Sequence, residues 1–180
     1  FMLLTAGLGA GIVLFNYKHL FHLKKSSSGL IIGGGQGMIE GKLVQYLALV
    51  DLSQAKPEPL FYRLSFLPHG VAIHPQKPHL LALFQKKGPN ACELNLETGH
   101  VERMIPTDAS RYFYGHGSYS ADGNHLYATE TILNSEEGVI VQRDSKTMTV
   151  ESLFPTFGAN PHDCLLVEKG SVAPRAGAWI

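Results

Sequence analysis

The chain has 180 residues, and its 15 Lys or Arg balance 15 Asp or Glu, so the formal net charge is zero with the histidines neutral. This balance excludes nucleic acid or an anionic membrane surface as a partner held by net charge. With 44% hydrophobic and 17% charged residues, the composition is that of one globular domain and not of a disordered or fibrous chain. The 19 glycines and 10 prolines predict short elements joined by many turns.

The N-terminal segment is apolar and uncharged over residues 1–15 and turns polar and basic over residues 16–25. A helix of 15 residues would span about 22 Å, short of the ~30 Å core of a bilayer, but its length fits the apolar region of an export signal. We expect residues 1–25 to be an apolar helix that acts as an export signal or a membrane anchor, which is the membrane contact we expect for this chain. A buried core helix is the alternative.

From Gly29 onward, short apolar segments alternate with turn clusters, which is typical of an all-β chain. The pattern repeats, because His69, His116 and His162 open similar segments at intervals of 47 and 46 residues. Strands are predicted in the same order in each repeat, at 70–73, 80–85, around Asn95 and 101–105, then at 117–120, 126–130, around Asp144 and 150–154, with 163–167 opening another repeat. An earlier partial copy covers 29–34, 45–54 and 60–64.

Four strands in about 46 residues is the spacing of one blade of a β-propeller. Residues 26–170 are therefore expected to form a partial propeller of four-stranded antiparallel blades, with one incomplete blade, two full blades and the first strand of another. Residues 171–180 do not continue the repeat and are expected to be an irregular tail. Since blades cover one another's faces, a ring could not close from these blades alone, and a nonfunctional truncated product that aggregates is one interpretation.

The runs PHGVAIHPQKP, ELNLETG, RYFYGHGSYSADGNHLYATE and GANPHDCLLVEKG resemble a family of uncharacterised exported bacterial proteins, numbered fifteen-thirteen among the domains of unknown function. The resemblance covers Gly29 to Gly170 and is most specific from Arg111 to Glu130. It implies a seven-bladed propeller of the YVTN or quinoprotein type, of which this chain would hold about three blades. It also implies a twin-arginine export signal and a periplasmic location, and it implies no established activity.

The recurring histidines His69, His116 and His162 are the strongest candidates for a site. One residue type at the same position of successive blades places equivalent side chains around the propeller axis. Neutral imidazoles that converge there would bind a transition metal or an anionic ligand. In the alternative interpretation, each His bonds a neighbouring backbone group or a turn carboxylate. Asp163 would accept a hydrogen bond from a histidine in either case.

A second set of candidates consists of Arg111, Tyr114 and Glu130. Arg111 and Tyr114 precede His116 in a loop between blades, and Glu130 ends the second strand of the same repeat. A cation, a phenol and a carboxylate near one histidine predict a ligand-binding mouth on the loop face. Aromatic packing between blades and a solvated strand end are the alternatives.

Known catalytic signatures are absent from the sequence. It contains no G-x-S-x-G, H-E-x-x-H or C-x-x-C pattern, and the glycine-rich segment 31–42 lacks the spacing of a phosphate-binding loop. We expect that segment to be a flexible loop between strands. Cys92 and Cys164 should lie two blades apart, too far for a disulfide.

These features predict a periplasmic propeller that acts as a binding module for a metal, a small ligand or a protein at its loop face. The alternative is a propeller enzyme, either a lactonase-like metal hydrolase or a quinoprotein-like oxidoreductase. A transition metal is the cofactor that the histidines suggest.

Overall fold

The computed structural model describes residues 3–5, 12–14 and 29–167. Within these ranges every regular element is a β-strand and all strand pairs are antiparallel, as the repeat predicted. No helix in this part of the chain has the length and hydrophobicity needed to cross a membrane. In chain order the strands are β1 (Leu3–Thr5), β2 (Ile12–Leu14), β3 (Leu30–Ile39), β4 (Lys42–Asp51), β5 (Pro59–Leu64), β6 (Pro68–Ile73), β7 (Leu80–Gly88), β8 (Ala91–Asn95), β9 (His100–Met104), β10 (Arg111–Tyr119), β11 (His125–Ile132), β12 (Glu137–Asp144) and β13 (Val150–Ala159).

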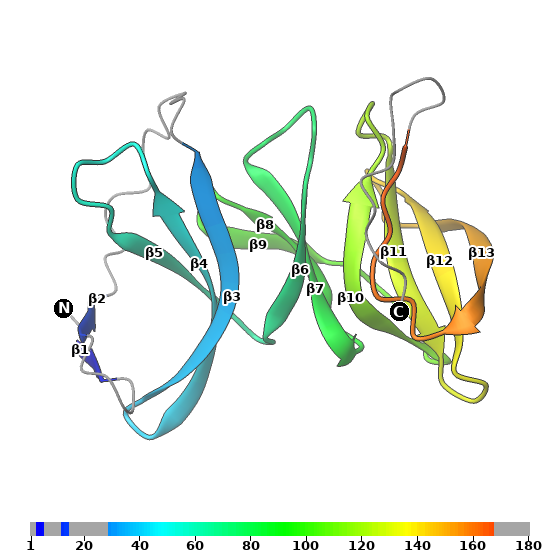
Figure 1. The fold of residues 1–180 in the computed structure, drawn as a ribbon, viewed down its shortest axis with the longest axis horizontal. Coiled ribbons are helices and arrows are strands. Elements are labelled where there is room, and N and C mark those ends of the chain that lie inside the picture. The colour runs from blue at the N-terminus through cyan, green and yellow to red at the C-terminus, as the bar shows by residue number, and fades with distance from the viewer. Residues whose placement is uncertain (1–2, 6–11, 15–28, 168–180) are drawn as a thin grey trace.

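Strands β3 to β13 form three twisted meanders that follow one another in space in chain order (Figure 1). The first meander holds β3, β4 and β5, the second holds β6 to β9, and the third holds β10 to β13. A short ladder between β7 and β10 joins the second meander to the third. The fold is therefore propeller-like, and its three meanders follow one another in the order that the repeat predicted.

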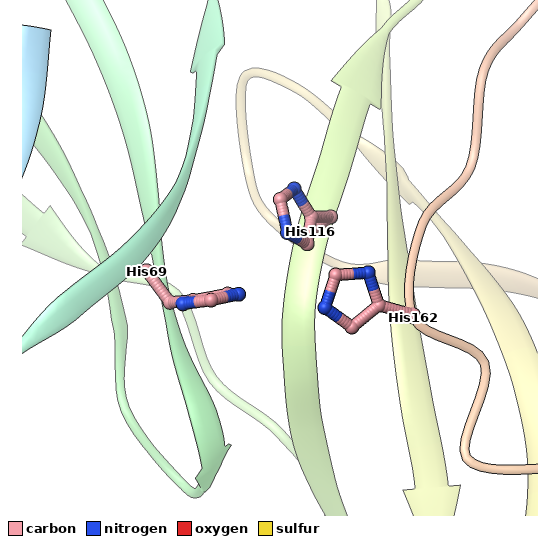
Figure 2. A group of neighbouring side chains, drawn as sticks. All are labelled: His69, His116 and His162. Atoms are coloured by element: carbon pink, nitrogen blue, oxygen red, sulfur yellow. The ribbon is translucent and has the colours of Figure 1, made fainter. Parts of the chain in front are cut away.

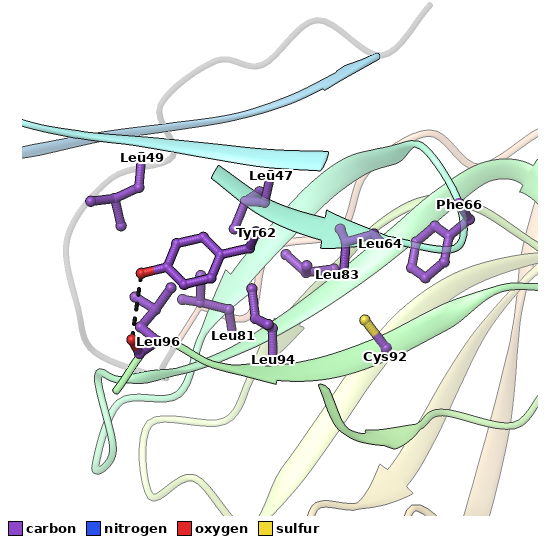
Figure 3. Close-up of a cluster of buried hydrophobic side chains, with 10 residues drawn as sticks. All are labelled: Leu47, Leu49, Tyr62, Leu64, Phe66, Leu81, Leu83, Cys92, Leu94 and Leu96. Carbon is purple, nitrogen blue, oxygen red and sulfur yellow. Dashed lines mark hydrogen bonds between the residues drawn. The ribbon is translucent and has the colours of Figure 1, made fainter. Parts of the chain in front are cut away.

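The first core lies between the first two meanders. Leu47 and Leu49 of β4 alternate with less buried residues, and each is fully buried. They pack against residues of β7 and β8 such as Leu81 and Leu94 (Figure 3). This period of two is what a strand with one buried face requires. The Tyr62 hydroxyl of β5 donates a hydrogen bond to the Leu96 carbonyl across this interface, at 3.4 Å.

The second core lies between the second and third meanders. Phe84 of β7 points away from the first core and packs with Phe113 of β10, with ring centroids 5.8 Å apart. Ala82 and Ala128 are fully buried in the same cluster. Because β7 is buried on both faces, it reads as the continuous apolar run LLALF. Each meander thus hides a face of its neighbour, as blades do.

The glycine-rich segment 31–42 is not the flexible loop that we expected. Residues 30–39 are strand β3, which pairs with β4 residue by residue from Leu30 opposite Asp51 to Ile39 opposite Lys42. Glu40 and Gly41 form the tight turn with φ values of 47° and 74°, the positive values that a two-residue hairpin of this twist needs.

Two further expectations fail or lie outside the described residues. Residues 163–167 were predicted to be a strand but have no regular structure, since they pair with no strand edge. A helix at residues 1–25 is not supported, because β1 and β2 pair as two short antiparallel strands. The rest of that segment and the tail 171–180 lie outside the described residues.

Candidate functional site

The structure brings His69, His116 and His162 together (Figure 2). One nitrogen of each ring can be chosen so that the three donor atoms lie within 4.8 Å of one another. The ring centroids are 4.9 Å apart for His69 and His116, 5.6 Å for His69 and His162, and 4.8 Å for His116 and His162. His69 comes from β6, His116 from β10, and His162 from the irregular segment that follows β13.

Irregular strand pairing turns two of these histidines toward each other. In the β6–β7 ladder, Pro68 lies opposite Gln85 and Gly70 opposite Phe84, so His69 is an extra residue. The β10–β11 ladder has a similar shift between Phe113 and Gly117, which contains His116. Bulges of this kind redirect side chains and are frequent beside functional sites. The 47-residue interval between His69 and His116 thus separates two similar irregularities of strand pairing in successive repeats.

Glycines allow strands β6 and β10 to approach closely at the bulges. A Cβ atom on Gly70 would lie 2.0 Å from the Gly115 carbonyl oxygen and 2.9 Å from the Cα atom of His116. Gly115 has a φ of 124°, and a Cβ atom there would lie 2.8 Å from the His69 ring. Each of these histidines is next to a glycine, His69 to Gly70 and His116 to Gly115. The close backbone contact at the glycines therefore brings the two imidazoles near each other.

His116 has the clearest donor atom of the three. Its Nε2 is buried and has no hydrogen-bond partner among the described residues. Its Nδ1 lies 3.8 Å from the Asp163 carboxylate, which is 67% exposed. A carboxylate beside one ring nitrogen favours the tautomer in which the other nitrogen can bind a metal. Asp163 was predicted to accept a hydrogen bond from a histidine; the structure places its carboxylate beside His116 but beyond hydrogen-bond distance.

The surroundings of His69 and His116 favour the neutral form of their imidazoles. Partial burial is the main cause that lowers the pKa of His69, and the positive charges of His116, Lys86 and His162 lower it further when present. Burial also lowers the pKa of His116, and the nearby Asp163 carboxylate opposes this in part. A neutral imidazole is the form that binds metals.

Lys86 is a neighbour of the cluster that the sequence did not reveal. Its Nζ lies 3.4 Å from Nε2 of His162. Lys86 is exposed and lies on β7 opposite Tyr114 of β10. No sequence motif identifies Lys86, because its proximity to the cluster depends on the short ladder between β7 and β10.

The set Arg111, Tyr114 and Glu130 does not form a mouth with the histidines. Glu130 is fully buried, and its carboxylate accepts hydrogen bonds from Thr107 at 2.9 Å, from Arg111 at 2.8 Å and from Arg143. This buried network ties β10, β11 and β12 to the chain that precedes β10. Glu130 is neither a ligand-binding residue of an open mouth nor a solvated strand end.

Tyr114 is also buried, with 7% of its surface exposed. The Lys87 ammonium lies 5.5 Å from its ring centroid, and the Tyr112 ring is 6.2 Å away. The packing interpretation therefore describes Tyr114 better than the ligand-binding one.

A cavity of about 500 Å³ borders the cluster. It is lined by residues of strands β6 and β10 and of the segment after β13, including Val71, Tyr119, His116, Asp163 and Cys164. Ligand pockets of small molecules have volumes of about 300 to 1,000 Å³. His116 and Asp163 thus face a space that a small organic molecule can enter.

The two cysteines, Cys92 and Cys164, are both free thiols. Burial raises the pKa of each thiol to about 12. Both are therefore protonated at neutral pH, and neither is an activated nucleophile.

Residues 64–174 match the model of a protein family described as a protein of unknown function, DUF1513. The chain belongs to this family. The DUF1513 match includes all three histidines of the cluster, together with Lys86 and Asp163. The resemblance stated from the sequence is confirmed. No curated protein matches the chain.

Solved structures similar to this DUF1513 chain include the dihydro-heme d1 dehydrogenase NirN in complex with DHE, at 14% identity and a TM-score of 0.49, over 68% of this chain and 28% of that one. A protein of unknown function from Bacteroides caccae matches at 17% identity and a TM-score of 0.47, over 74% and 43%. The β-propeller domain of the Trilobed protease from Pyrococcus furiosus matches at 12% identity and a TM-score of 0.47, over 71% of this chain and 40% of that one. The chain spans less than half the length of each.

Proposed function

We propose that the chain is the metal-binding part of an exported propeller protein, in which His69, His116 and His162 hold one transition-metal ion. The observation that carries the proposal is the set of three donor nitrogens within 4.8 Å of one another. Tetrahedral metal–nitrogen bonds of about 2.1 Å place donors about 3.4 Å apart. A metal ion would have to draw the donor nitrogens closer together, and the Nε2 of His116 has no hydrogen-bond partner among the described residues to lose.

Three protein ligands leave one coordination position open, which is the arrangement of functional metal sites and not of closed structural ones. The cavity lined by His116 and Asp163 supports this proposal, because it offers a small molecule a place beside the metal. Imidazole donors suit zinc, copper, nickel and iron. The function supported best is therefore the binding of a metal ion that in turn holds a small ligand.

The proposal includes the setting of the site. We propose that residues 1–25 direct the protein to the periplasm, and that about three blades here belong to a ring of seven whose loop face meets a small ligand or a protein. The apolar run of residues 1–15 supports export. Release of the protein by osmotic shock from cells that express its whole gene tests this, and retention with cytoplasmic markers would contradict it.

Zinc uptake by the purified chain tests the metal site. Equilibrium dialysis against zinc, followed by metal analysis, should give one zinc per chain, and His162→Ala should lower the affinity by at least about 100-fold because one of three ligands is lost. His125→Ala is the matched control, since His125 lies 3.3 Å from Glu151 and outside the cluster. Equal zinc uptake by the wild type and His162→Ala would contradict the proposal.

A further inference from the structure

The charges around the histidine cluster do not balance for a bound metal ion. Three neutral imidazoles leave the two positive charges of a divalent cation uncompensated. Asp163 is the carboxylate that lies beside the cluster, and it faces Nδ1 of His116 from a distance of 3.8 Å. Lys86 adds a positive charge 3.4 Å from a nitrogen of His162. The charges of Asp163 and Lys86 cancel, so the occupied site would keep a net charge of plus two.

Lys86 is not engaged elsewhere in the described structure. It forms no ion pair with a carboxylate of residues 29–167. Its neighbour Lys87, by contrast, lies over the Tyr114 ring. A free ammonium beside a metal site weakens cation binding by like-charge repulsion. The position of the Lys86 ammonium becomes favourable when a negatively charged group also binds beside the metal.

We infer that the metal at His69, His116 and His162 takes an oxyanion, a carboxylate or phosphate group, at its open coordination position, and that the Lys86 ammonium strengthens the binding of this group. The inference rests on the proposed metal site and names the class of its ligand. The oxyanion neutralises the metal, and Lys86 attracts it from beside His162. The neighbouring cavity of about 500 Å³ leaves room for an organic remainder of the same molecule.

Cobalt-substituted protein allows the metal and the anion to be followed separately. The full chain is loaded with Co²⁺, and its visible absorption is recorded while acetate or inorganic phosphate is added at constant ionic strength with perchlorate. We expect a saturable spectral change with one of the two probes or both, and their relative affinities distinguish a carboxylate from a phosphate ligand.

The variants Lys86→Met and Lys87→Met then separate the role of Lys86 from that of surface charge. Lys86→Met should bind the same one Co²⁺ with higher affinity, and its anion affinity should fall by about tenfold. Lys87→Met carries the same net charge change in a neighbouring residue and should behave like the wild type.

The outcomes distinguish the two proposals. Absence of bound Co²⁺ in the wild type would overturn the metal site and the inference together. A cobalt protein whose spectrum ignores both anions, or a Lys86→Met variant that binds them as tightly as the wild type, would overturn the inference and leave the metal site standing. Equal anion binding by the metal-free chain, measured by isothermal titration calorimetry, would also overturn the inference, because the metal would not hold the anion.

Discussion

Replacing Glu130 with alanine should lower the free energy of unfolding by about 3–5 kcal/mol. The Glu130 carboxylate is the ion-pair partner of Arg143, whose side chain is fully buried, and of Arg111, whose side chain is 12% exposed. Two other guanidinium nitrogens of Arg143 already lack hydrogen-bond partners among the described residues. Without Glu130, a buried cation remains with the Pro106 carbonyl and the face of Phe113 as its neighbours.

Urea denaturation followed by circular dichroism measures this loss. The matched control is Glu137→Ala, since Glu137 is exposed and its carboxylate accepts a hydrogen bond from the nearby Ser135 alone among described residues. Its replacement should change the free energy of unfolding by no more than about 0.5 kcal/mol. The pair Glu130→Leu with Arg143→Met should recover part of the lost stability, because the buried ion pair is replaced by apolar side chains while Arg111 still lacks its partner. A loss below about 1 kcal/mol for Glu130→Ala would contradict the buried network.

The second large effect is expected at Gly70, where alanine should destabilise the chain by about 1–3 kcal/mol or more. The new methyl group would meet the Gly115 carbonyl oxygen at 2.0 Å, and backbone atoms cannot turn aside as a side chain does. Strands β6 and β10 would have to separate at the position where His69 and His116 meet. Zinc affinity should therefore fall along with stability.

Thermal melting with and without zinc checks both parts of this prediction. Gly33→Ala is the control, because a Cβ atom there has no neighbour within 4 Å. It should leave zinc affinity unchanged and preserve or slightly raise the melting temperature. A Gly70→Ala variant with wild-type melting and wild-type zinc affinity would show that the two strands do not approach as described.

The repeat made much of the fold readable from the sequence. Short apolar segments alternate with turn clusters, and equivalent segments recur at 47 and 46 residues around His69, His116 and His162, so both the strand order and the shared histidine position follow from local patterns. The same periodicity misled at residues 163–167. These residues resemble a first strand, but they lack the neighbouring strand edge that would make them one.

Pairing between strands decided what the residue patterns alone could not. Glycine disfavours strands, yet segment 30–39 pairs with β4 along its whole length because the tight turn at Glu40 and Gly41 sets the register. Glu130 was a candidate ligand-binding residue from the sequence, but nothing in the sequence joined it to Arg143, which reaches it from another strand. Lys86 reaches the cluster through the irregular ladder between β7 and β10.

X-ray absorption of the zinc-loaded chain tests most directly whether the three imidazoles share one ion. The account predicts three imidazole nitrogens at about 2.0–2.1 Å from zinc, with one further light ligand. It also predicts the loss of one imidazole in His116→Ala. A zinc shell with at most one imidazole, or a spectrum that His116→Ala leaves unchanged, would contradict a common centre for His69, His116 and His162.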